Sequence, residues 1–189
     1  MKLRMVAWTA NDLVRRLDDV IAVYVDAMRY HEGDAAARKA RFLAHARRPG
    51  LRAIATMTEE GTLVGFCYGY VSEPGQWWHD QVHAALGEDG RQRWLSDCFE
   101  VVELHVSPPA QGHGIGASQL RALLGMATAR TSLLSTPEAD ENRSRAWRLY
   151  RRFGFEDVLR NFIFPGDARP FAILGRTLPL PVTAEKIPA

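Results

Sequence analysis

Residues 99–124 combine, in direct succession, an apolar strand pattern, a glycine-rich loop and a helix pattern. The segment from Phe99 to Val106 is rich in β-branched residues, which predicts a strand. Pro108 and Pro109 end it, because proline cannot donate a hydrogen bond to a neighbouring strand. A loop rich in glycine follows, and then apolar residues at helical spacing. Glycine lets the backbone come close to a ligand, and the first N–H groups of a helix have no partner inside it. The stretch therefore predicts a cradle for a phosphate group.

The loop itself fits more than one pattern. Gly112, Gly114 and Ala117 satisfy the dinucleotide fingerprint G-x-G-x-x-G/A, and Glu138 lies about 20 residues further on, where a ribose-binding acid would stand. From Gln111 onward, the same residues spell Q-x-x-G-x-G. A third interpretation is a tight turn between strand and helix that binds nothing, which so many glycines disfavour. The rest of the chain has to decide.

Composition predicts one globular domain. The chain has 189 residues, of which 47% are hydrophobic, and we expect residues 1–179 to form a single domain and residues 180–189 a tail. The net charge is +2 and no long basic run occurs, so nucleic acid is not an expected partner. No window approaches the roughly 18 apolar residues of a membrane span, and the first apolar stretch is too short for a signal peptide. Cys67 and Cys98 fit buried free thiols, and we expect a cytoplasmic protein with no membrane partner.

The remaining patterns predict the order β-α-α-β-β-β-α-β-α-β-β. The first half should contain a strand at Leu3–Trp8, a helix capped by Thr9 or Asn11, a helix over Asp34–Arg47, and an antiparallel hairpin of Leu51–Met57 with Leu63–Val71. The second half should add, after the loop and its helix, a strand at Ser132–Ser135, a helix at Asn142–Phe153, and strands at Phe155–Phe164 and Phe171–Leu178. The first half lacks the repeated βαβ units of a dinucleotide-binding fold.

A tryptophan-rich insert, residues 75–98, precedes the central strand. We expect two short helices there. Trp77 and Trp78 either pack the insert onto the sheet or line a substrate pocket. His79 and His83 are spaced i,i+4 on the predicted helix, but no third ligand lies at a suggestive spacing, so we expect no metal.

Two sequence blocks resemble the GNAT superfamily of N-acetyltransferases. The first is Q-x-x-G-x-G, from Gln111 to Gly116, and the second is A-x-x-L-Y-x-x-x-G-F, from Ala146 to Phe155. The element order is also similar, and the resemblance covers most of the chain apart from the insert and the tail. It implies an α/β (α+β) fold, with a mixed, mostly antiparallel central sheet flanked by helices. A dinucleotide-binding oxidoreductase is thereby the weaker alternative.

The resemblance implies acetyl-CoA as cosubstrate. In this family the strands that correspond to Phe99–Val106 and Ser132–Ser135 splay apart, and the cofactor lies between them. Its pantetheine would pair with the backbone of the first strand and its pyrophosphate would lie over the loop. The implied cofactor-binding residues are Leu104, His105, Val106, Gln111, Gly112, His113, Gly114, Ile115, Gly116 and Asn142. An acceptor amine would attack the thioester directly, helped by a backbone N–H that polarises the carbonyl.

Two residues are the predicted catalytic groups. Tyr150 matches the tyrosine that protonates the departing thiolate in many family members, although a core tyrosine would fit the same helix pattern. Glu100 matches the position of a glutamate or histidine base, with Glu103, His105 and a water chain as alternatives. Strict strand alternation places Glu100 on one face and Glu103 with His105 on the other, and a bulge would change this.

One departure from the family pattern concerns the cofactor. The family often has an asparagine seven residues before the tyrosine, where this chain has Arg143, and Asn142 lies one residue earlier. Asn142 then either reaches the pantetheine or only caps the helix, and Arg143 offers a charge for a phosphate. The acceptor stays open between a small-molecule amine and a peptide or protein amine. A homodimer and a non-catalytic acyl-CoA-binding module also stay open.

Overall fold

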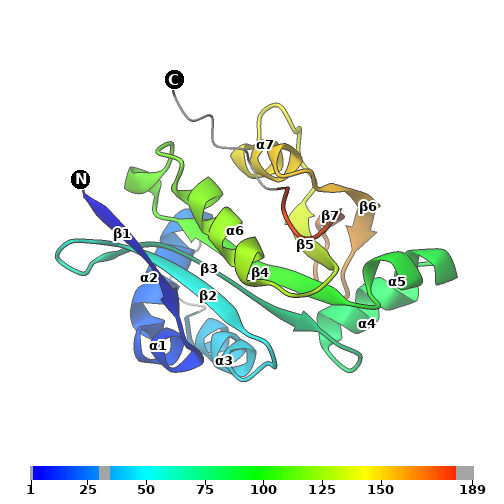
Figure 1. Ribbon diagram of the computed structural model, residues 1–189, viewed down its shortest axis with the longest axis horizontal. Coiled ribbons are helices and arrows are strands. Elements are labelled where there is room, and N and C mark those ends of the chain that lie inside the picture. Colours follow the sequence, from blue (N-terminus) through cyan, green and yellow to red (C-terminus); the bar gives the residue numbers. More distant parts are fainter. Residues whose placement is uncertain (1, 30–34, 182–189) are drawn as a thin grey trace.

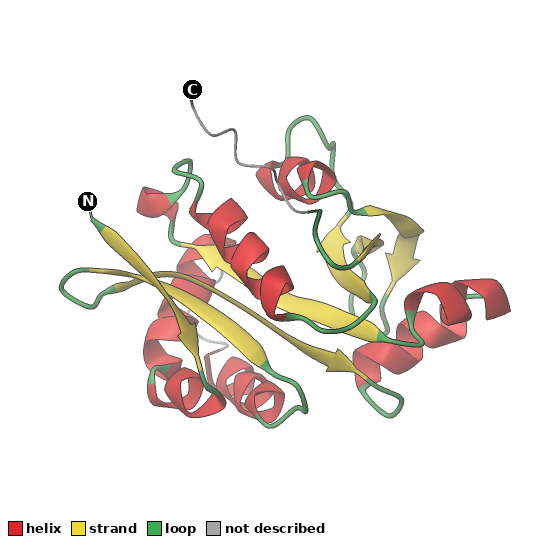
Figure 2. Ribbon diagram, viewed as in Figure 1, coloured by secondary structure: helices red, strands yellow, loops and turns green. Residues whose placement is uncertain are grey.

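The computed structural model describes residues 2–29 and 35–181. Within these residues the strands form one 7-stranded sheet in the order β1-β2-β3-β4-β5-β7-β6 (Figure 1). Neighbouring strands are antiparallel except β4 and β5, which run parallel. The predicted mixed, mostly antiparallel sheet flanked by helices is confirmed (Figure 2).

The elements follow the predicted order, except that the first helix is divided into α1 and α2 and the insert adds two helices. The strands are β1 (Leu3–Trp8), β2 (Arg52–Thr58), β3 (Leu63–Ser72), β4 (Cys98–Val106), β5 (Thr131–Pro137), β6 (Glu156–Ile163) and β7 (Pro170–Thr177). The helices are α1 (Ala10–Arg15), α2 (Leu17–Met28), α3 (Ala35–Ala46), α4 (Trp77–Ala85), α5 (Glu88–Trp94), α6 (Ile115–Met126) and α7 (Arg145–Arg152). A 3-10 turn, η2 (Pro108–Ala110), joins β4 to the glycine loop.

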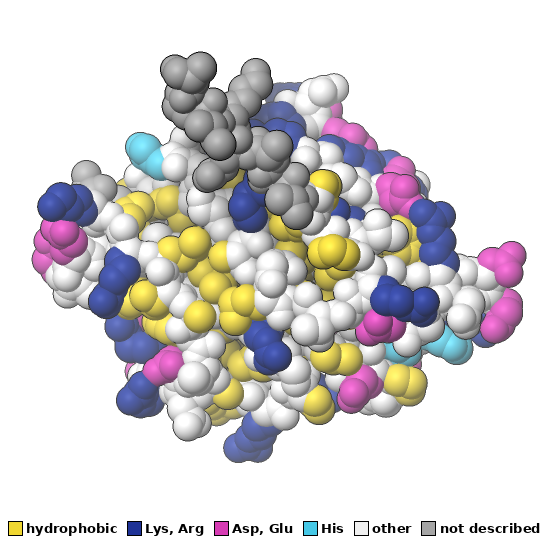
Figure 3. Space-filling model, in the orientation of Figure 1, with side chains coloured by type: hydrophobic (Ala, Val, Ile, Leu, Met, Phe, Trp, Pro, Cys, Tyr) yellow, Lys and Arg dark blue, Asp and Glu magenta, His cyan; other side chains and the backbone are white. Residues whose placement is uncertain are grey.

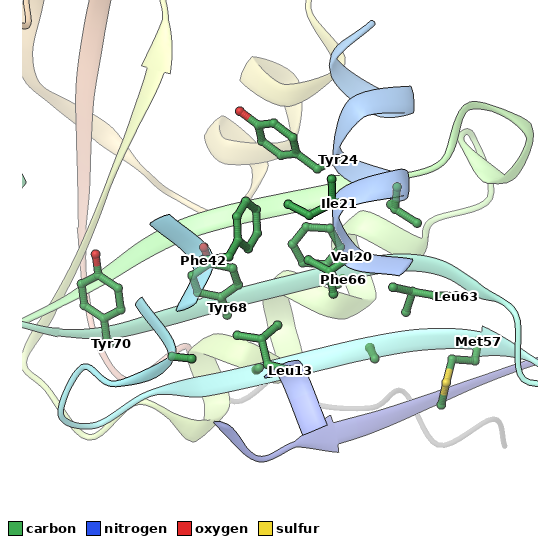
Figure 4. Close-up of a cluster of buried hydrophobic side chains, with 14 residues drawn as sticks. Leu13, Val20, Ile21, Tyr24, Phe42, Met57, Leu63, Phe66, Tyr68 and Tyr70 are labelled. Carbon is green, nitrogen blue, oxygen red and sulfur yellow. The ribbon is translucent and has the colours of Figure 1, made fainter. Parts of the chain in front are cut away.

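Helices cover the sheet on both sides. On one side, called the α2 face below, α1, α2 and α3 pack on the first strands around Phe42, Phe66 and Tyr68 (Figure 4). On the other, called the α6 face, α6 and α7 pack around Leu120 and Trp147. Hydrophobic side chains also gather at the surface over part of the molecule in Figure 3.

The insert lies on the α2 face beyond the first helices. Trp78 and Trp94 are buried together with Leu133 of β5 and Ile173 of β7. Their side chains therefore pack α4 and α5 against the sheet. The packing interpretation is therefore confirmed for Trp78. Trp77 is different, because its side chain is 53% exposed and lies against Phe164.

A bulge in β4 changes which side chains share a face. Tyr68 pairs with Glu103 and Gly69 pairs with Val101, so Val102 has no residue opposite it. The extra residue shifts the alternation of the strand by one position. A side chain at residue 69 would clash, since a Cβ there would lie 2.2 Å from the carbonyl oxygen of Glu100.

The consequence is that the acidic and histidine candidates lie together. Val102 packs in the α2-face core, whereas Val101 and Leu104 pack on the α6 face. Glu100, Glu103 and His105 therefore all face α2 and α3, and the separation expected from strict alternation is wrong.

Two predicted helices need correction. The single helix expected after Thr9 is interrupted at Arg16, whose φ of −104° and ψ of 22° divide α1 from α2. Thr9, and not Asn11, is the N-cap, with Asp12 completing a capping box. The last helix begins at residue 145 because the Ser144 side chain accepts a hydrogen bond from the Trp147 N–H. The interpretation of Asn142 as its N-cap is therefore wrong.

Both cysteines are free and buried, as expected. Over residues 2–29 and 35–181, no helix combines the length and apolar character needed to cross a membrane.

Candidate active site

The centre of the site is the point where β4 and β5 separate. The two strands pair only where Cys98 to Glu100 meets Thr131 to Leu133. Beyond that point β4 continues along β3, while β5 continues along β7. Among the described strands, none pairs with the β5-facing edge of β4 after Glu100. The predicted splaying is confirmed, and it exposes backbone donors and acceptors to a ligand.

A cavity of about 880 Å³ lies along this opening on the α6 face. Its volume is within the range of small-molecule and cofactor sites. The lining includes these residues predicted from the sequence: Leu104, Val106, Gln111, Gly112, Gly114, Ile115, Gly116, Asn142 and Tyr150. His105 and His113 are not among the lining residues. Arg143 does not line it either.

The glycine loop has the geometry of an anion cradle. Gly112 and Gly114 have φ values of +85° and +78°, which side chains rarely adopt, and a Cβ on either would meet open space. Gly114 is the N-cap of α6 and supplies no side-chain hydrogen bond. Within the described residues, the N–H groups of residues 112–117 donate to no protein acceptor. The start of α6 therefore offers free donors at the positive end of its dipole.

Gln111 connects the cradle to both walls of the cavity. Its Nε2 donates to the carbonyl oxygen of Val106 at 2.9 Å, at the end of β4. Its Oε1 accepts from Arg145 Nη1 at 3.0 Å, at the start of α7. The side chain thus fixes the loop between strand and helix.

Tyr150 forms part of the inner wall. Its ring packs edge-on against Phe155, with the centroids 6.0 Å apart, and it also lines the cavity. Among the described residues its hydroxyl has no hydrogen-bond partner, so it is free to donate to a ligand. Burial, with smaller contributions from the charges of Glu103 and Cys67, raises the pKa of Tyr150 to about 12. The phenol is therefore neutral and protonated at physiological pH.

Glu103 and His105 form a hydrogen-bonded pair on the α2 face. Glu103 Oε2 lies 2.6 Å from His105 Nε2, and the side chains are 14% and 11% exposed. The His105 ring stands edge-on to Tyr24 at 4.9 Å. When Nε2 donates to the carboxylate, the neutral imidazole keeps its lone pair at Nδ1. That atom can accept a proton.

Glu100 is buried deeper than this pair. The residue is 5% exposed, and within the described part of the chain its Oε2 has no hydrogen-bond partner. Burial and the neighbouring charge of Glu103 raise the pKa of Glu100 to about 8, although Arg48 opposes the shift. Below that pH the carboxyl group is mainly neutral, and it does not line the cavity.

The structure also brings in residues that no motif marked. His45 Nδ1 lies within hydrogen-bonding distance, 2.8 Å, of Tyr68 Oη, and burial lowers the pKa of His45 to about 4, so its ring is neutral at physiological pH. On the α6 face, Arg145, Arg148 and Arg152 line the cavity. Their spacing along one helix, without acidic residues between them, was the available sequence signal.

The histidines of the insert are not arranged as metal ligands. His79 Nδ1 is 3.0 Å from Ser72 Oγ, and its ring stacks on that of His83 at 6.0 Å. Within the described ranges, no three histidine, cysteine or acidic side chains are grouped so that they could hold a metal ion.

Comparison with known proteins decides the family. The Acetyltransferase (GNAT) family matches residues 17–155, which include the splayed strands, the cradle and Tyr150. The chain belongs to this family. It is therefore an acetyltransferase, and the dinucleotide-binding alternative is set aside.

Individual relatives agree with this placement. The GCN5-like protein acetyltransferase Rv2170 of Mycobacterium tuberculosis is 41% identical over 206 residues, covering 95% of this chain and 100% of the relative. The PaiA N-acetyltransferase of Thermoplasma acidophilum, solved in complex with coenzyme A, has a TM-score of 0.60 at 14% identity, over 94% of this chain and 100% of that one. The yncA protein of Salmonella typhimurium, solved with its cofactor acetyl-CoA, has a TM-score of 0.62 at 14% identity, over 95% of each chain. These two structures share the GNAT fold with this chain.

Proposed function

We propose that this acetyltransferase moves an acetyl group from acetyl-CoA to an amine by direct attack of the amine on the thioester. One observation carries the proposal: the cavity between the diverging strands has the free N–H groups of the cradle in one wall and the Tyr150 hydroxyl in another. Two proteins of the same fold were solved with coenzyme A or acetyl-CoA, which supports this choice of cofactor.

In this proposal the chain holds the cofactor at two places. The N–H groups of residues 112–117 bind the pyrophosphate, because an anion at a helix start meets free donors and a favourable dipole. The unpaired edge of β4 at Leu104–Val106 pairs with the amides of the pantetheine, as an added strand would. Asn142, which lines the same cavity, contacts the pantetheine from the other side.

Tyr150 acts as the general acid in this proposal. A phenol with a pKa of about 12 is a weak acid, and in water it would not readily protonate a thiolate. The same apolar surroundings also disfavour a thiolate, as shown by burial raising the pKa of the nearby Cys67 thiol. Donation from the phenol therefore neutralises the leaving sulfur, and the resulting phenolate regains a proton from water.

We propose that the Glu103–His105 pair takes the proton of the amine. Acetyl-CoA occupies the α6 face of the opening, so the acceptor approaches from the α2 face, where this pair lies. Glu103 holds His105 with Nδ1 free to accept. Glu100 is the alternative base suggested by the family resemblance, and its burial limits it to pH values near or above 8.

The acceptor to test first is an amine on a peptide or protein. The mycobacterial relative, 41% identical over nearly the whole chain, is named a protein acetyltransferase. Small-molecule amines form the second group to test.

Thiol release from acetyl-CoA, measured with lysine-containing peptides, peptides with free N-termini and small amines, tests the proposal. We expect release above the rate of hydrolysis with at least one acceptor class, and acetylated product by mass spectrometry. Tight CoA binding without release on any amine would instead support a non-catalytic acyl-CoA-binding module.

A further inference from the structure

Helix α7 carries arginines in two different situations. Arg151 is neutralised, since Nη2 lies 2.6 Å from Glu141 and 2.5 Å from Asp157. Arg145, Arg148 and Arg152, called the arginine row below, are exposed and form no ion pair with any described residue. All three line the cavity that contains the cradle.

The arginine row is electrostatically unfavourable in the unliganded protein. Its members are spaced i, i+3 and i+7, so neighbouring guanidinium groups lie on one side of the helix and repel each other. Arg145 also stands in the first turn of α7, where the helix dipole is positive and no residue is acidic, whereas Arg152 lies in the last turn, where the dipole favours a cation. A bound anion would offset both effects.

The contacts of the row do not neutralise it. Arg145 donates to the side-chain oxygen of Gln111, and Arg148 donates to the carbonyl oxygen of Asn142, both of which are neutral. In the described part of the chain, the guanidinium group of Arg152 makes no hydrogen bond. Guanidinium groups bind phosphate oxygens through paired N–H donors, so the row has the chemistry of a phosphate site.

The cofactor offers a phosphate for this site. The cradle at Gly112–Gly116 accounts for the pyrophosphate of CoA, which leaves the monoester on the 3′ position of the ribose. A phosphate monoester carries more negative charge than either phosphate group of the pyrophosphate. It is therefore bound better by cations than by neutral N–H donors.

We propose that the arginine row binds the ribose 3′-phosphate of CoA, and that the enzyme thereby distinguishes CoA thioesters from their 3′-dephospho forms. This inference rests on the proposed function, because it takes CoA as the ligand. Arg145 has a second role, since its contact with Gln111 couples this site to the cradle.

Affinities for CoA and for 3′-dephospho-CoA, measured by calorimetry, test the inference. The wild type should bind CoA about tenfold more tightly or better, as expected for charge-assisted hydrogen bonds to one phosphate. In an Arg148→Gln/Arg152→Gln variant this preference should fall toward one, with the affinity for 3′-dephospho-CoA nearly unchanged. Arg143→Gln is the matched control, because Arg143 is exposed on the same segment but does not line the cavity.

Stability gives an independent readout. Removing like charges should leave the Tm of the unliganded double variant equal to or above that of the wild type, whereas Arg151→Gln should lower it by breaking two ion pairs. If the double variant does not fold, the ratio of the two affinities is measured in Arg152→Gln alone, where it should fall part of the way toward one.

Failure of the phosphate assignment and failure of the proposed function give different results. A wild type that binds both ligands equally, or a variant that loses affinity for both to the same degree, overturns the phosphate assignment and leaves the proposed function intact. A wild type that binds neither ligand overturns the proposed function itself.

Discussion

His105 Nε2 lies 2.6 Å from Glu103 Oε2, and the β4 bulge at Val102 turns both side chains toward the same face as Glu100. If this pair takes the proton from the acceptor, His105→Gln should lower kcat/KM for the amine roughly 100-fold, the usual contribution of a general base. CoA affinity should stay constant, because the side chain lies on the opposite face from the cavity. Full activity in His105→Gln, combined with loss of activity in Glu100→Gln, would assign the base to Glu100.

The raised pKa of Glu100 predicts how the stability of the protein depends on pH. Its pKa is raised to about 8 in the folded protein from an ordinary value of 4.5, so the folded state binds the extra proton between these values. The contribution of the protonated Glu100 to the free energy of unfolding is therefore fully present below about pH 4.5 and is lost as the pH rises through 8. Glu100→Gln removes this dependence.

Thermal unfolding at pH 5 and pH 9 measures the effect. The difference between the Tm of Glu100→Gln and the Tm of the wild type should be more positive at pH 9 than at pH 5. The same difference at both values would show that the carboxyl group ionises normally.

Much of the site was predictable because its signals are local. The strand, prolines and glycines of residues 99–116 lie next to each other in the sequence, and their turn chemistry fixes the cradle. The antiparallel hairpin of β2 and β3 was predictable for the same reason.

The remaining features depend on contacts between distant segments. The bulge arises where Gly69 lets β3 approach the backbone of Glu100, which no pattern within β4 reveals. The start of α7 was misplaced because Asn142 and Ser144 are both good caps, and only the folded chain selects Ser144. Burial of Trp78 and exposure of Trp77 follow from how the insert docks on β5 and β7.

Tyr150→Phe should lower kcat roughly 100-fold with little change in the dissociation constant of CoA, since only the donated proton is lost. The ring packing against Phe155 stays available to phenylalanine, so the Tm should remain close to that of the wild type. Undiminished turnover in this variant would mean that water protonates the leaving thiolate.

Trp77 and Trp78 should behave differently. Trp77 is exposed beside Phe164, and we expect it to contact the acceptor, so Trp77→Ala should raise KM for the amine and leave KM for acetyl-CoA unchanged. Trp78→Ala is the comparison, and loss of a buried tryptophan should cost about 3–5 kcal/mol of stability. Unchanged acceptor kinetics in Trp77→Ala would restrict the insert to a structural role.

Calorimetric titration of Gly114→Glu with acetyl-CoA tests the central claim most directly. Gly114 has a φ of +78° and open space beside it, so glutamate would place bulk and negative charge where the pyrophosphate is expected. Gly166→Glu is the matched control, since Gly166 has a φ of +88° and equally open surroundings in the turn between β6 and β7, away from the cavity. The account predicts loss of binding in folded Gly114→Glu and wild-type affinity in Gly166→Glu. Equal acetyl-CoA affinity in the wild type and folded Gly114→Glu would contradict it.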